Sequence, residues 1–162
     1  MNGMRNSEAG AKYMGTNTRD IRNGMLASFT GTIALSAIMV MKQAAGMVPQ
    51  MNPIADLTGI VHNLLGLPVG PLFGWVLHFT IGTFVWGPVF AVLHPAIPGS
   101  NLIKGLIFGV GAWLLMMSIF LPIAGQGLFG MNVGMVVPVM ALMLHLVYGV
   151  VLGVVFGKLS TR

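Results

Sequence analysis

The sequence predicts an all-α integral membrane protein with four transmembrane helices, arranged as two duplicated hairpins plus a short outer interfacial helix. Of the 162 residues, 56% are apolar and only 7% are charged, whereas soluble domains carry about 25% charged residues. Asp, Glu, Lys and Arg are absent from 57–103 and again from 105–157. Each stretch is long enough for two crossings, or for one crossing and a surface element, since a crossing needs about 20 residues. A water-soluble globular protein is therefore excluded.

Two crossings are expected in the first half of the chain. The first covers about 25–41 and lies between Arg22 and Lys42, whose long apolar stem lets its ammonium group reach the interface. The second covers about 71–93 and opens with Pro71, because proline is accepted in the first turn of a helix. Both should be helical, since backbone groups in lipid must be hydrogen-bonded within their own segment.

Two more crossings are expected in the second half. The third covers about 102–123 and ends near Pro122 and a group of glycines. The fourth covers about 136–157 and stops at Lys158. All four segments have the length that a helix needs to span the hydrocarbon core of a bilayer.

A short helix is expected at 53–66, between the first two crossings. Asn52 is a favourable N-cap, Pro53 suits the first helical position, and Asp56 belongs in the first turn. The segment is too short to cross a bilayer. It should therefore lie in the outer interface or fold back onto the bundle.

An internal duplication is indicated when the chain is compared with itself. A shift of 67 residues aligns four pairs: Pro71 and Pro138, Leu77 and Leu144, His78 and His145, and Gly82 and Gly149. A shift of 81 residues aligns Gly24 with Gly105. We interpret the chain as hairpin one at 23–94, which contains the short helix, and hairpin two at 101–158. Units with an even number of crossings keep their orientation, so the pseudo-twofold axis should run along the membrane normal.

The remaining segment, 1–22, is a polar tail that precedes the membrane domain at 23–162. Its composition is typical of segments that are disordered alone, so a protein partner is expected to order it.

Lys and Arg residues set the orientation of the crossings. One side of the membrane holds only Lys42, and the other side holds Arg5, Lys12, Arg19, Arg22, Lys104, Lys158 and Arg162. Both termini are therefore expected in the cytoplasm.

His78 and His145 are the main candidates for a ligand site, because the duplication places them at one depth on opposite sides of the axis. Each follows a proline by seven residues, which is about 10 Å along a helix. One hypothesis is a b-type haem with both imidazoles as axial ligands. The alternative is that each imidazole simply bonds a carbonyl or hydroxyl group of a neighbouring helix. A metal or proton role is a third possibility.

Small residues flank these histidines at a spacing of four. Gly82 and Gly149 each lie four residues after a histidine, and the first crossing carries Ser28, Thr32 and Ser36. Small residues at this spacing let another helix, or a flat ligand, approach the backbone. We therefore expect a groove beside each histidine, with both imidazoles facing the bundle interior.

Methionine is abundant, with 14 residues, several of them near the outer side. Thioether and imidazole ligands together suit copper(I), and Met131 with Met135, or Met140 with His145, would share a face. The alternative is that methionine fills irregular gaps in apolar packing. The absence of a Met-x-x-Met cluster in a polar loop favours this alternative.

Lys42, Asp56 and His62 form a third candidate group, expected at the outer surface. An ion pair between Lys42 and Asp56 would fasten the short helix to the end of the first crossing. Charged residues at the membrane interface are also candidates for a functional site. These three residues could bind a quinone or a lipid head group there.

Other classes of function find no support in the sequence. Cysteine is absent, which excludes disulfides and thiolate chemistry. No catalytic constellation such as His-Glu-x-x-His occurs, so an enzyme is not expected and no metal ligands are assigned. The net charge of +5 is explained by the flanks of the crossings and does not indicate nucleic acid. A permease for a metal ion or small solute would need a continuous polar path between the hairpins.

Three segments, 74–82, 105–117 and 145–149, carry a resemblance to a known family. They resemble small four-helix bacterial membrane proteins of unknown function, over roughly 22–157. The resemblance implies four helices and a bacterial inner-membrane location, and it implies no activity.

The expected function is that of a non-catalytic membrane protein, an accessory or assembly subunit of a larger respiratory or photosynthetic complex. Its partners would be the lipid bilayer and other membrane-protein subunits. One alternative is an electron-transfer protein with haem b held by His78 and His145. The other alternative is a small permease.

Overall fold

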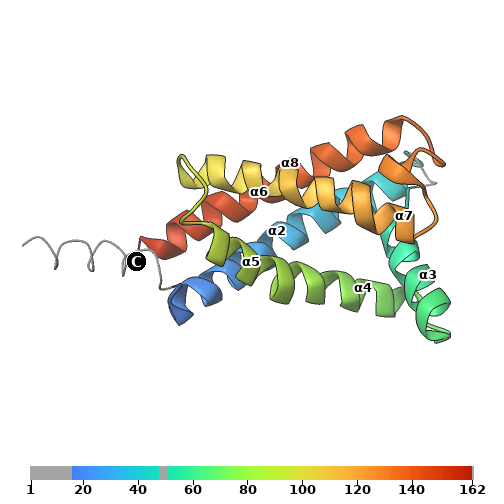
Figure 1. Cartoon of the computed structure of the whole chain (residues 1–162), viewed down its shortest axis with the longest axis horizontal. Helices are drawn as coiled ribbons and strands as arrows, with labels where there is room; N and C mark the ends of the chain where they lie inside the picture. The colour runs from blue at the N-terminus through green and yellow to red at the C-terminus, as the bar shows by residue number, and fades with distance from the viewer. Residues whose placement is uncertain (1–15, 48–50, 162) are drawn as a thin grey trace, which may run out of the picture.

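The computed structural model describes residues 16–47 and 51–161, and these residues form helices and connections without any strand. The four long helical segments run side by side along the molecule (Figure 1). Each is long and apolar enough to span a membrane: Thr18–Ala44, Pro71–Leu93, Asn101–Ile123 and Val136–Ser160. The predicted all-α protein with four crossings is therefore confirmed.

The first crossing, α2 (Thr18–Ala44), begins several residues earlier than expected. Asn17 caps it: its side-chain oxygen accepts from the N–H of Arg19, and the Asp20 carboxylate accepts from the N–H of Asn17 at 3.3 Å. This reciprocal arrangement is a capping box, which satisfies N–H groups that a helix start leaves free. The end of the predicted tail is thus helical from Thr18, while residues 1–15 lie outside the described part of the chain.

The short helix between the first two crossings is present as α3 (Pro53–Leu65). The Asn52 side chain accepts from the N–H of Ala55 at 3.1 Å, so it caps the helix as predicted. Gly66 ends the helix with φ of 67°, a left-handed conformation that glycine adopts without steric cost.

The second and third crossings are each interrupted by a π-helical segment. Their parts are α4 (Pro71–Thr80), η1 (Ile81–Val85) and α5 (Trp86–Leu93), then α6 (Asn101–Leu115), η2 (Met116–Phe120) and α7 (Leu121–Ile123). Each π-helical segment contains the residue four positions before a proline, Phe84 before Pro88 and Ser118 before Pro122. Proline lacks an N–H group and clashes with the carbonyl four residues earlier. A wider turn removes that clash.

The fourth crossing, α8 (Val136–Ser160), pairs with α6 in hairpin two as α5 pairs with α2 in hairpin one. Glycines let the two helix backbones of each pair approach each other closely. A Cβ atom at Gly87 would lie 2.7 Å from the Cα of Met25, and one at Gly105 would lie 2.8 Å from the Cα of Gly153. Gly24 and Gly105, which the duplication aligns, both face a glycine of the partner helix in their own hairpin.

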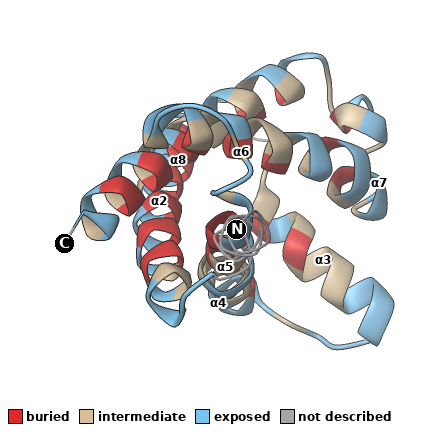
Figure 2. Ribbon diagram, turned by 60° about the vertical axis from the view of Figure 1, so that its left-hand side comes forward, coloured by how far each residue is buried: buried red, intermediate tan, exposed pale blue. Residues whose placement is uncertain are grey.

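The two hairpins do not pack symmetrically. Helix α2 lies along α8, whereas α4 makes no comparable contact with α6 among the described residues. Buried residues are accordingly concentrated where α2, α5 and α8 meet (Figure 2). The end of the bundle that holds Thr18 and Ser160 is called the terminal end below, and the opposite end is called the α3 end (Figure 1).

Aromatic side chains close the bundle toward the terminal end. The Phe90 ring lies 5.1 Å from Phe108 and 5.2 Å from Phe156, and Trp86 contacts Phe108 at 5.8 Å between ring centroids. Edge-to-face arrangements of this kind are favourable for aromatic rings. Hairpins one and two are therefore joined at this end and diverge toward the α3 end.

Candidate functional site

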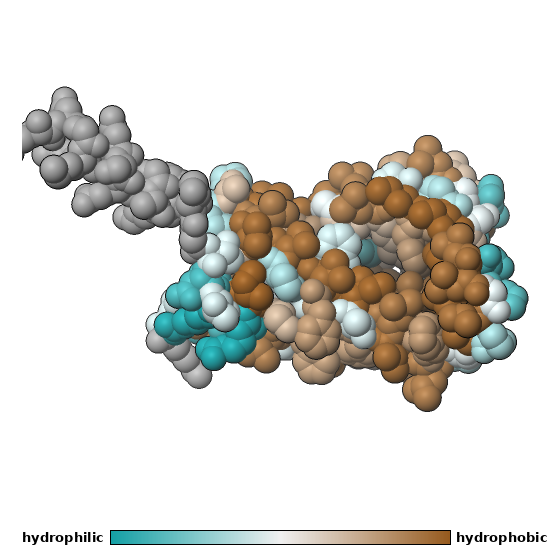
Figure 3. Space-filling view, turned by 60° about the horizontal axis from the view of Figure 1, so that its bottom comes forward, coloured by the Kyte–Doolittle hydropathy of each residue, from teal (hydrophilic) through white to brown (hydrophobic). Residues whose placement is uncertain are grey.

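A cavity of about 370 Å³ lies where the hairpins diverge, between the four crossings and α3. A space-filling view shows a hollow ringed by apolar residues in the half of the molecule toward the α3 end (Figure 3). Apolar side chains make up most of its wall: Leu35, Met39, Met51, Leu57, Ile81, Met116, Phe120 and Leu144. Both π-helical segments contribute to this wall, so their widened turns help to shape the cavity.

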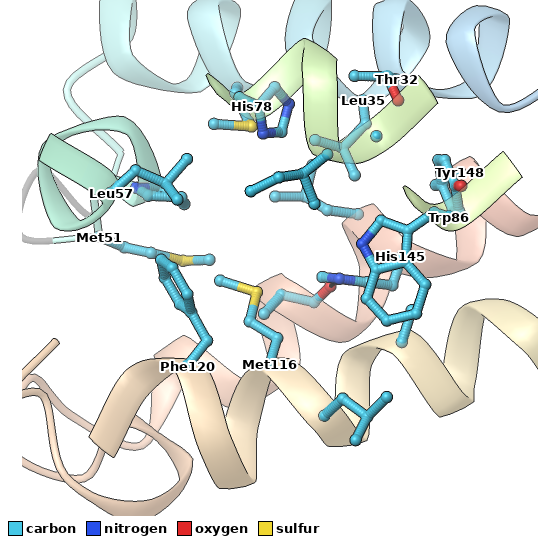
Figure 4. Close-up of a pocket in the computed structure, with 18 of the residues that line it drawn as sticks. Thr32, Leu35, Met51, Leu57, His78, Trp86, Met116, Phe120, His145 and Tyr148 are labelled. Atoms are coloured by element: carbon cyan, nitrogen blue, oxygen red, sulfur yellow. Dashed lines mark hydrogen bonds between the residues drawn. The ribbon is translucent and has the colours of Figure 1, made fainter. Parts of the chain in front are cut away.

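His145 projects from α8 and lines the cavity (Figure 4). Its Nδ1 lies 2.8 Å from the carbonyl oxygen of Ala141, one turn earlier. A carbonyl oxygen only accepts hydrogen bonds, so Nδ1 carries the hydrogen, and the neutral ring offers Nε2 as an acceptor. No described residue donates to this Nε2, which leaves it for a ligand.

His78 projects from α4 and lines the same cavity, so the structure brings the two predicted histidines to one site. Its Nε2 lies 3.2 Å from the Oγ of Ser36, a buried residue of α2. Within the described part of the chain, Ser36 has no other acceptor for its hydroxyl hydrogen. We therefore assign Ser36 as the donor and His78 Nε2 as the acceptor, a contact that holds this imidazole against α2.

Trp86 forms the deep end of the cavity, next to His145. Figure 4 shows the edge of its indole that bears the nitrogen turned toward His145 and the open space. The Nε1–H group donates to none of the residues described here, unlike that of Trp113, which donates to the carbonyl oxygen of Pro138 at 2.9 Å. Trp86 could not be predicted as a site residue, because a tryptophan in an apolar helix carries no sequence pattern of its own.

Ser28, Thr32 and Tyr148 form a hydrogen-bonded group beside this deep end. Ser28 Oγ donates to the carbonyl oxygen of Gly82, so Tyr148 must donate its hydroxyl hydrogen to Ser28. Thr32 Oγ1 donates to the carbonyl oxygen of Ser28 at 2.9 Å. The stripe of small residues on the first crossing thus connects α2 to η1 and α8.

The glycines predicted to form a groove beside the histidines serve helix packing instead. A Cβ atom at Gly82 would lie 3.0 Å from Cγ2 of Thr32, so α2 covers that face, although Gly82 still borders the cavity. A Cβ atom at Gly149 would lie 3.0 Å from the carbonyl carbon of Gly105, so α6 covers that face. Gly149 does not line the cavity.

A haem with two axial histidines does not fit the contacts that the structure shows. His145 lines the cavity and no described residue bonds its Nε2, but Nε2 of His78 is bonded to Ser36. The polar groups at the wall also include no arginine or lysine that would pair with the haem propionates. One imidazole is thus free to bind a ligand, and the other is held by its own structural contact.

The methionines near the histidines differ from those expected for copper. Met131 and Met135 are 54% and 69% exposed and lie away from the cavity, and Met140 packs partly buried against the core and does not line the cavity either. Met39, Met51 and Met116 line it instead. In the described ranges, no three or more His, Asp or Glu residues come together in a group that could hold a metal ion.

The predicted group of Lys42, Asp56 and His62 is not assembled. Lys42 Nζ donates to the carbonyl oxygen of Met51 at 2.7 Å, and Asp56 accepts from Gln126 Nε2 at 2.9 Å, so the expected ion pair is not formed. Asp56 instead fastens α3 to hairpin two. His62 Nδ1 lies 3.3 Å from the carbonyl oxygen of Leu67, at the end of α3. Burial raises the pKa of Asp56, and the bond from Gln126 partly offsets that rise.

A second polar group, missed in the sequence, joins the hairpins at the terminal end. His94 Nε2 donates to Asn101 Oδ1 at 2.8 Å, and Lys104 Nζ donates to the carbonyl oxygen of His94 at 2.8 Å. Burial lowers the pKa of His94, and the bond to Asn101 opposes that shift. The His94 ring also packs against Phe156, with ring centroids 4.6 Å apart and the two planes tilted by 43°. These contacts fix the turn between α5 and α6, far from the cavity.

Comparison with known proteins gives a family and no activity. No curated protein and no solved structure matches the chain. The model of a family of unknown function matches residues 18–162, from the start of α2 onward. The resemblance noted in the sequence is therefore confirmed, and the chain belongs to the family of unknown function DUF6789.

Proposed function

We propose that this chain is a non-catalytic membrane protein that holds a lipid-soluble ligand in the cavity between its hairpins, as an accessory subunit of a larger membrane complex. The observation that carries the proposal is the cavity itself. Its volume of about 370 Å³ is that of small-molecule sites, which are concave, mostly apolar and provided with a few polar groups. The polar groups here are imidazole, indole and hydroxyl groups, which can hydrogen-bond a ligand and orient it in the cavity.

The position of the cavity mouth supports a ligand that comes from the bilayer. Leu115 and Ile119 line the cavity and are themselves 46% and 51% exposed, so the opening lies on the apolar flank of the bundle. A ligand passing this opening would move between lipid and protein without entering water. That route favours an apolar molecule over an ion or a polar solute.

The charges support a location in the bacterial inner membrane with both termini in the cytoplasm. Arg19, Arg22, Lys104 and Lys158 belong to the terminal end, where hydrophilic residues gather in Figure 3, whereas Lys42 belongs to the α3 end. Lys and Arg are enriched on the cytoplasmic side of membrane proteins. This orientation puts the cavity in the outer half of the bilayer.

Two neighbouring positions provide a matched test of the proposal. Ala112 is buried and lines the cavity, so Ala112→Phe should fill it. Gly111 meets nothing within 4 Å, so Gly111→Phe adds the same side chain on the lipid side. We expect lipid-soluble molecules to co-purify with the wild type and with Gly111→Phe, and to be lost from Ala112→Phe, in native mass spectrometry. Equal retention by both variants would overturn the proposal.

The accessory role makes a separate prediction for the chain in its native membrane. After gentle solubilisation it should migrate with larger subunits on a native gel. Migration as an isolated small protein would contradict the accessory role. It would not contradict the proposal that the cavity binds a ligand.

A further inference from the structure

We infer that the ligand is a hydroxylated aromatic ring with an apolar tail, a lipid-soluble phenol or quinol, bound through its hydroxyl group at the deep end of the cavity. The inference rests on the proposed function and adds the chemical class of the ligand. It is carried by two groups of the cavity wall, one acceptor and one donor, for which the described part of the chain offers no hydrogen-bond partner.

The acceptor is Nε2 of His145. The bond from Nδ1 to the carbonyl oxygen of Ala141, at 2.8 Å, fixes the tautomer and the orientation of the ring. A ligand group that meets this nitrogen must therefore donate a hydrogen. An ether, an ester or a quinone carbonyl has no hydrogen to donate and would leave the acceptor unsatisfied in an apolar cavity.

The donor is Nε1–H of Trp86, on the facing wall. Among the residues described, neither Trp86 nor any other donor makes a hydrogen bond to Nε2 of His145, so both groups are left for a ligand in the cavity that they line. A hydroxyl group placed between them would donate to the imidazole and accept from the indole. Only a group that is both donor and acceptor satisfies both sides, and a hydroxyl is the simplest one.

The remainder of the wall favours an aromatic ring next to that hydroxyl. Figure 4 shows Trp86 at one end of the open space and Phe120 at the other, with the thioethers of Met51 and Met116 along the wall between them. Aromatic rings stack on such rings, and methionine sulfur makes favourable contacts with ring edges. The mouth at Leu115 and Ile119 gives an apolar tail a way out to the lipid.

Three related probes test the inference on the full chain in lipid nanodiscs. They are 4-nonylphenol, its methyl ether 4-nonylanisole, which lacks the donor hydrogen, and 4-nonylcyclohexanol, which keeps the hydroxyl but not the aromatic ring. Binding to Ala112→Phe measures partition into lipid and is subtracted. We expect the phenol to bind about tenfold more tightly than the anisole, the effect of one net hydrogen bond. The cyclohexanol should bind more weakly than the phenol.

A pair of variants assigns the discrimination to the histidine. His145→Phe should lower the affinity for the phenol to that for the anisole and leave the affinity for the anisole unchanged. His62→Phe lies outside the cavity and should leave the preference intact. A His145→Phe protein that still prefers the phenol tenfold would overturn the assignment of the acceptor.

The outcomes separate this inference from the proposed function. Equal affinity of the wild type for phenol and anisole would overturn the inference, while specific binding of both would uphold the cavity as a ligand site. Equal affinity of the wild type for 4-nonylphenol and 4-nonylcyclohexanol would overturn the inference that the ligand carries an aromatic ring, and it would point to a membrane alcohol. No binding above the Ala112→Phe level, together with no co-purified molecule, would overturn both.

Discussion

Ser28 is the residue at which the buried polar contacts of this bundle converge. It is fully buried, and its hydroxyl group connects α2 to the carbonyl of Gly82 in η1 and to Tyr148 in α8. Loss of that hydroxyl would remove the acceptor of the Tyr148 phenol and one hydrogen bond to the carbonyl of Gly82 in an apolar interior, which is costly. The contact also fixes the floor of the cavity, because Gly82 and Tyr148 both line it.

The first prediction concerns this serine. Ser28→Ala should lower the free energy of unfolding by about 1–2 kcal/mol, the upper range for interhelical hydrogen bonds in membranes. Thr30→Ala is the control, because Thr30 Oγ1 bonds only the carbonyl oxygen of Leu26 in its own helix and is exposed. Denaturant unfolding in detergent measures both. Equal stability of the two variants would show that the Ser28 contacts contribute nothing net.

The second prediction concerns the charge on Asp56. Burial raises its pKa in the folded state above the unfolded value. The folded protein therefore favours the protonated carboxyl, and this contribution is present below the unfolded pKa and lost as pH rises through the folded pKa. Docking of α3 should weaken from about pH 4 to neutral pH, as measured by the hydrogen-exchange protection factors of 53–65, which are corrected for the intrinsic exchange rate at each pH.

Asp56→Asn provides the matched control for that pH effect. The amide keeps an acceptor for Gln126 and carries no charge, so the protection factors of α3 should become high and independent of pH in this range. Persistence of the pH dependence in Asp56→Asn would assign it to another group.

Two kinds of local geometry position the elements of this fold: close glycine contacts within each hairpin and π-helical turns before proline. The glycines bring the backbones of α2 and α5, and of α6 and α8, into contact. The π-helical turns lie in the two crossings that diverge, α4 with η1 and α6 with η2. The first feature closes each hairpin, and the second shapes the walls of the space left between them.

The third prediction tests the glycine contacts. A Cβ atom at Gly105 meets backbone atoms of Gly149 and Gly153, whereas one at Gly111 meets nothing within 4 Å. Gly105→Ala should therefore cost about 1–3 kcal/mol by overpacking. Gly111→Ala should be neutral or slightly stabilising, because alanine favours helix over glycine by about 1 kcal/mol. Thermal unfolding in detergent compares the two, and an equal effect at both positions would contradict a close contact at Gly105.

The fourth prediction tests the π-helical segments. Pro88→Ala restores an N–H group and removes the clash with the carbonyl of Phe84, so η1 should return to a regular α-helix. The register of Ile81 and Gly82 would shift, and ligand retention should fall several-fold while stability stays level or rises.

Pro71→Ala is the matched control for that experiment, since Pro71 opens α4 and has no helical carbonyl four residues before it. It should leave ligand retention unchanged. Native mass spectrometry reports retention, and hydrogen exchange of 81–85 reports the change of helix type. If Pro88→Ala changed the hydrogen exchange of 81–85 but retained all of the ligand, the π-helical turn would not be needed for ligand binding, and the prediction would be wrong.

At the scale of the whole molecule, the cavity exists because two similar hairpins pack dissimilarly. Helix α2 lies along α8, and the corresponding approach of α4 to α6 is replaced by an opening that α3 partly covers. Helix α3 is held there by Asp56 and Gln126, which belong to different hairpins. The inserted helix of hairpin one is therefore part of the site.

The fifth prediction concerns orientation, and the absence of cysteine from the sequence makes it simple to test. Ser100→Cys and Thr161→Cys lie at the terminal end and should react with a membrane-impermeant thiol reagent only from the cytoplasmic side. Asn63→Cys, on the exposed face of α3, should react only from the opposite side. Labelling of all three from one side would contradict four crossings.

The class of this protein, the four crossings and α3 follow from the sequence alone, because charge-free length and helix-start residues act locally. The pairing of His78 with His145 also follows from it, since the duplication aligns them. Helix packing is needed to explain why His78 is held by Ser36 while His145 and Trp86 line open space. The same packing explains why Asp56 bonds Gln126 and not Lys42, and why Gly149 lies against α6. These outcomes depend on how far apart the two hairpins lie, and that distance follows from the packing of all four crossings together.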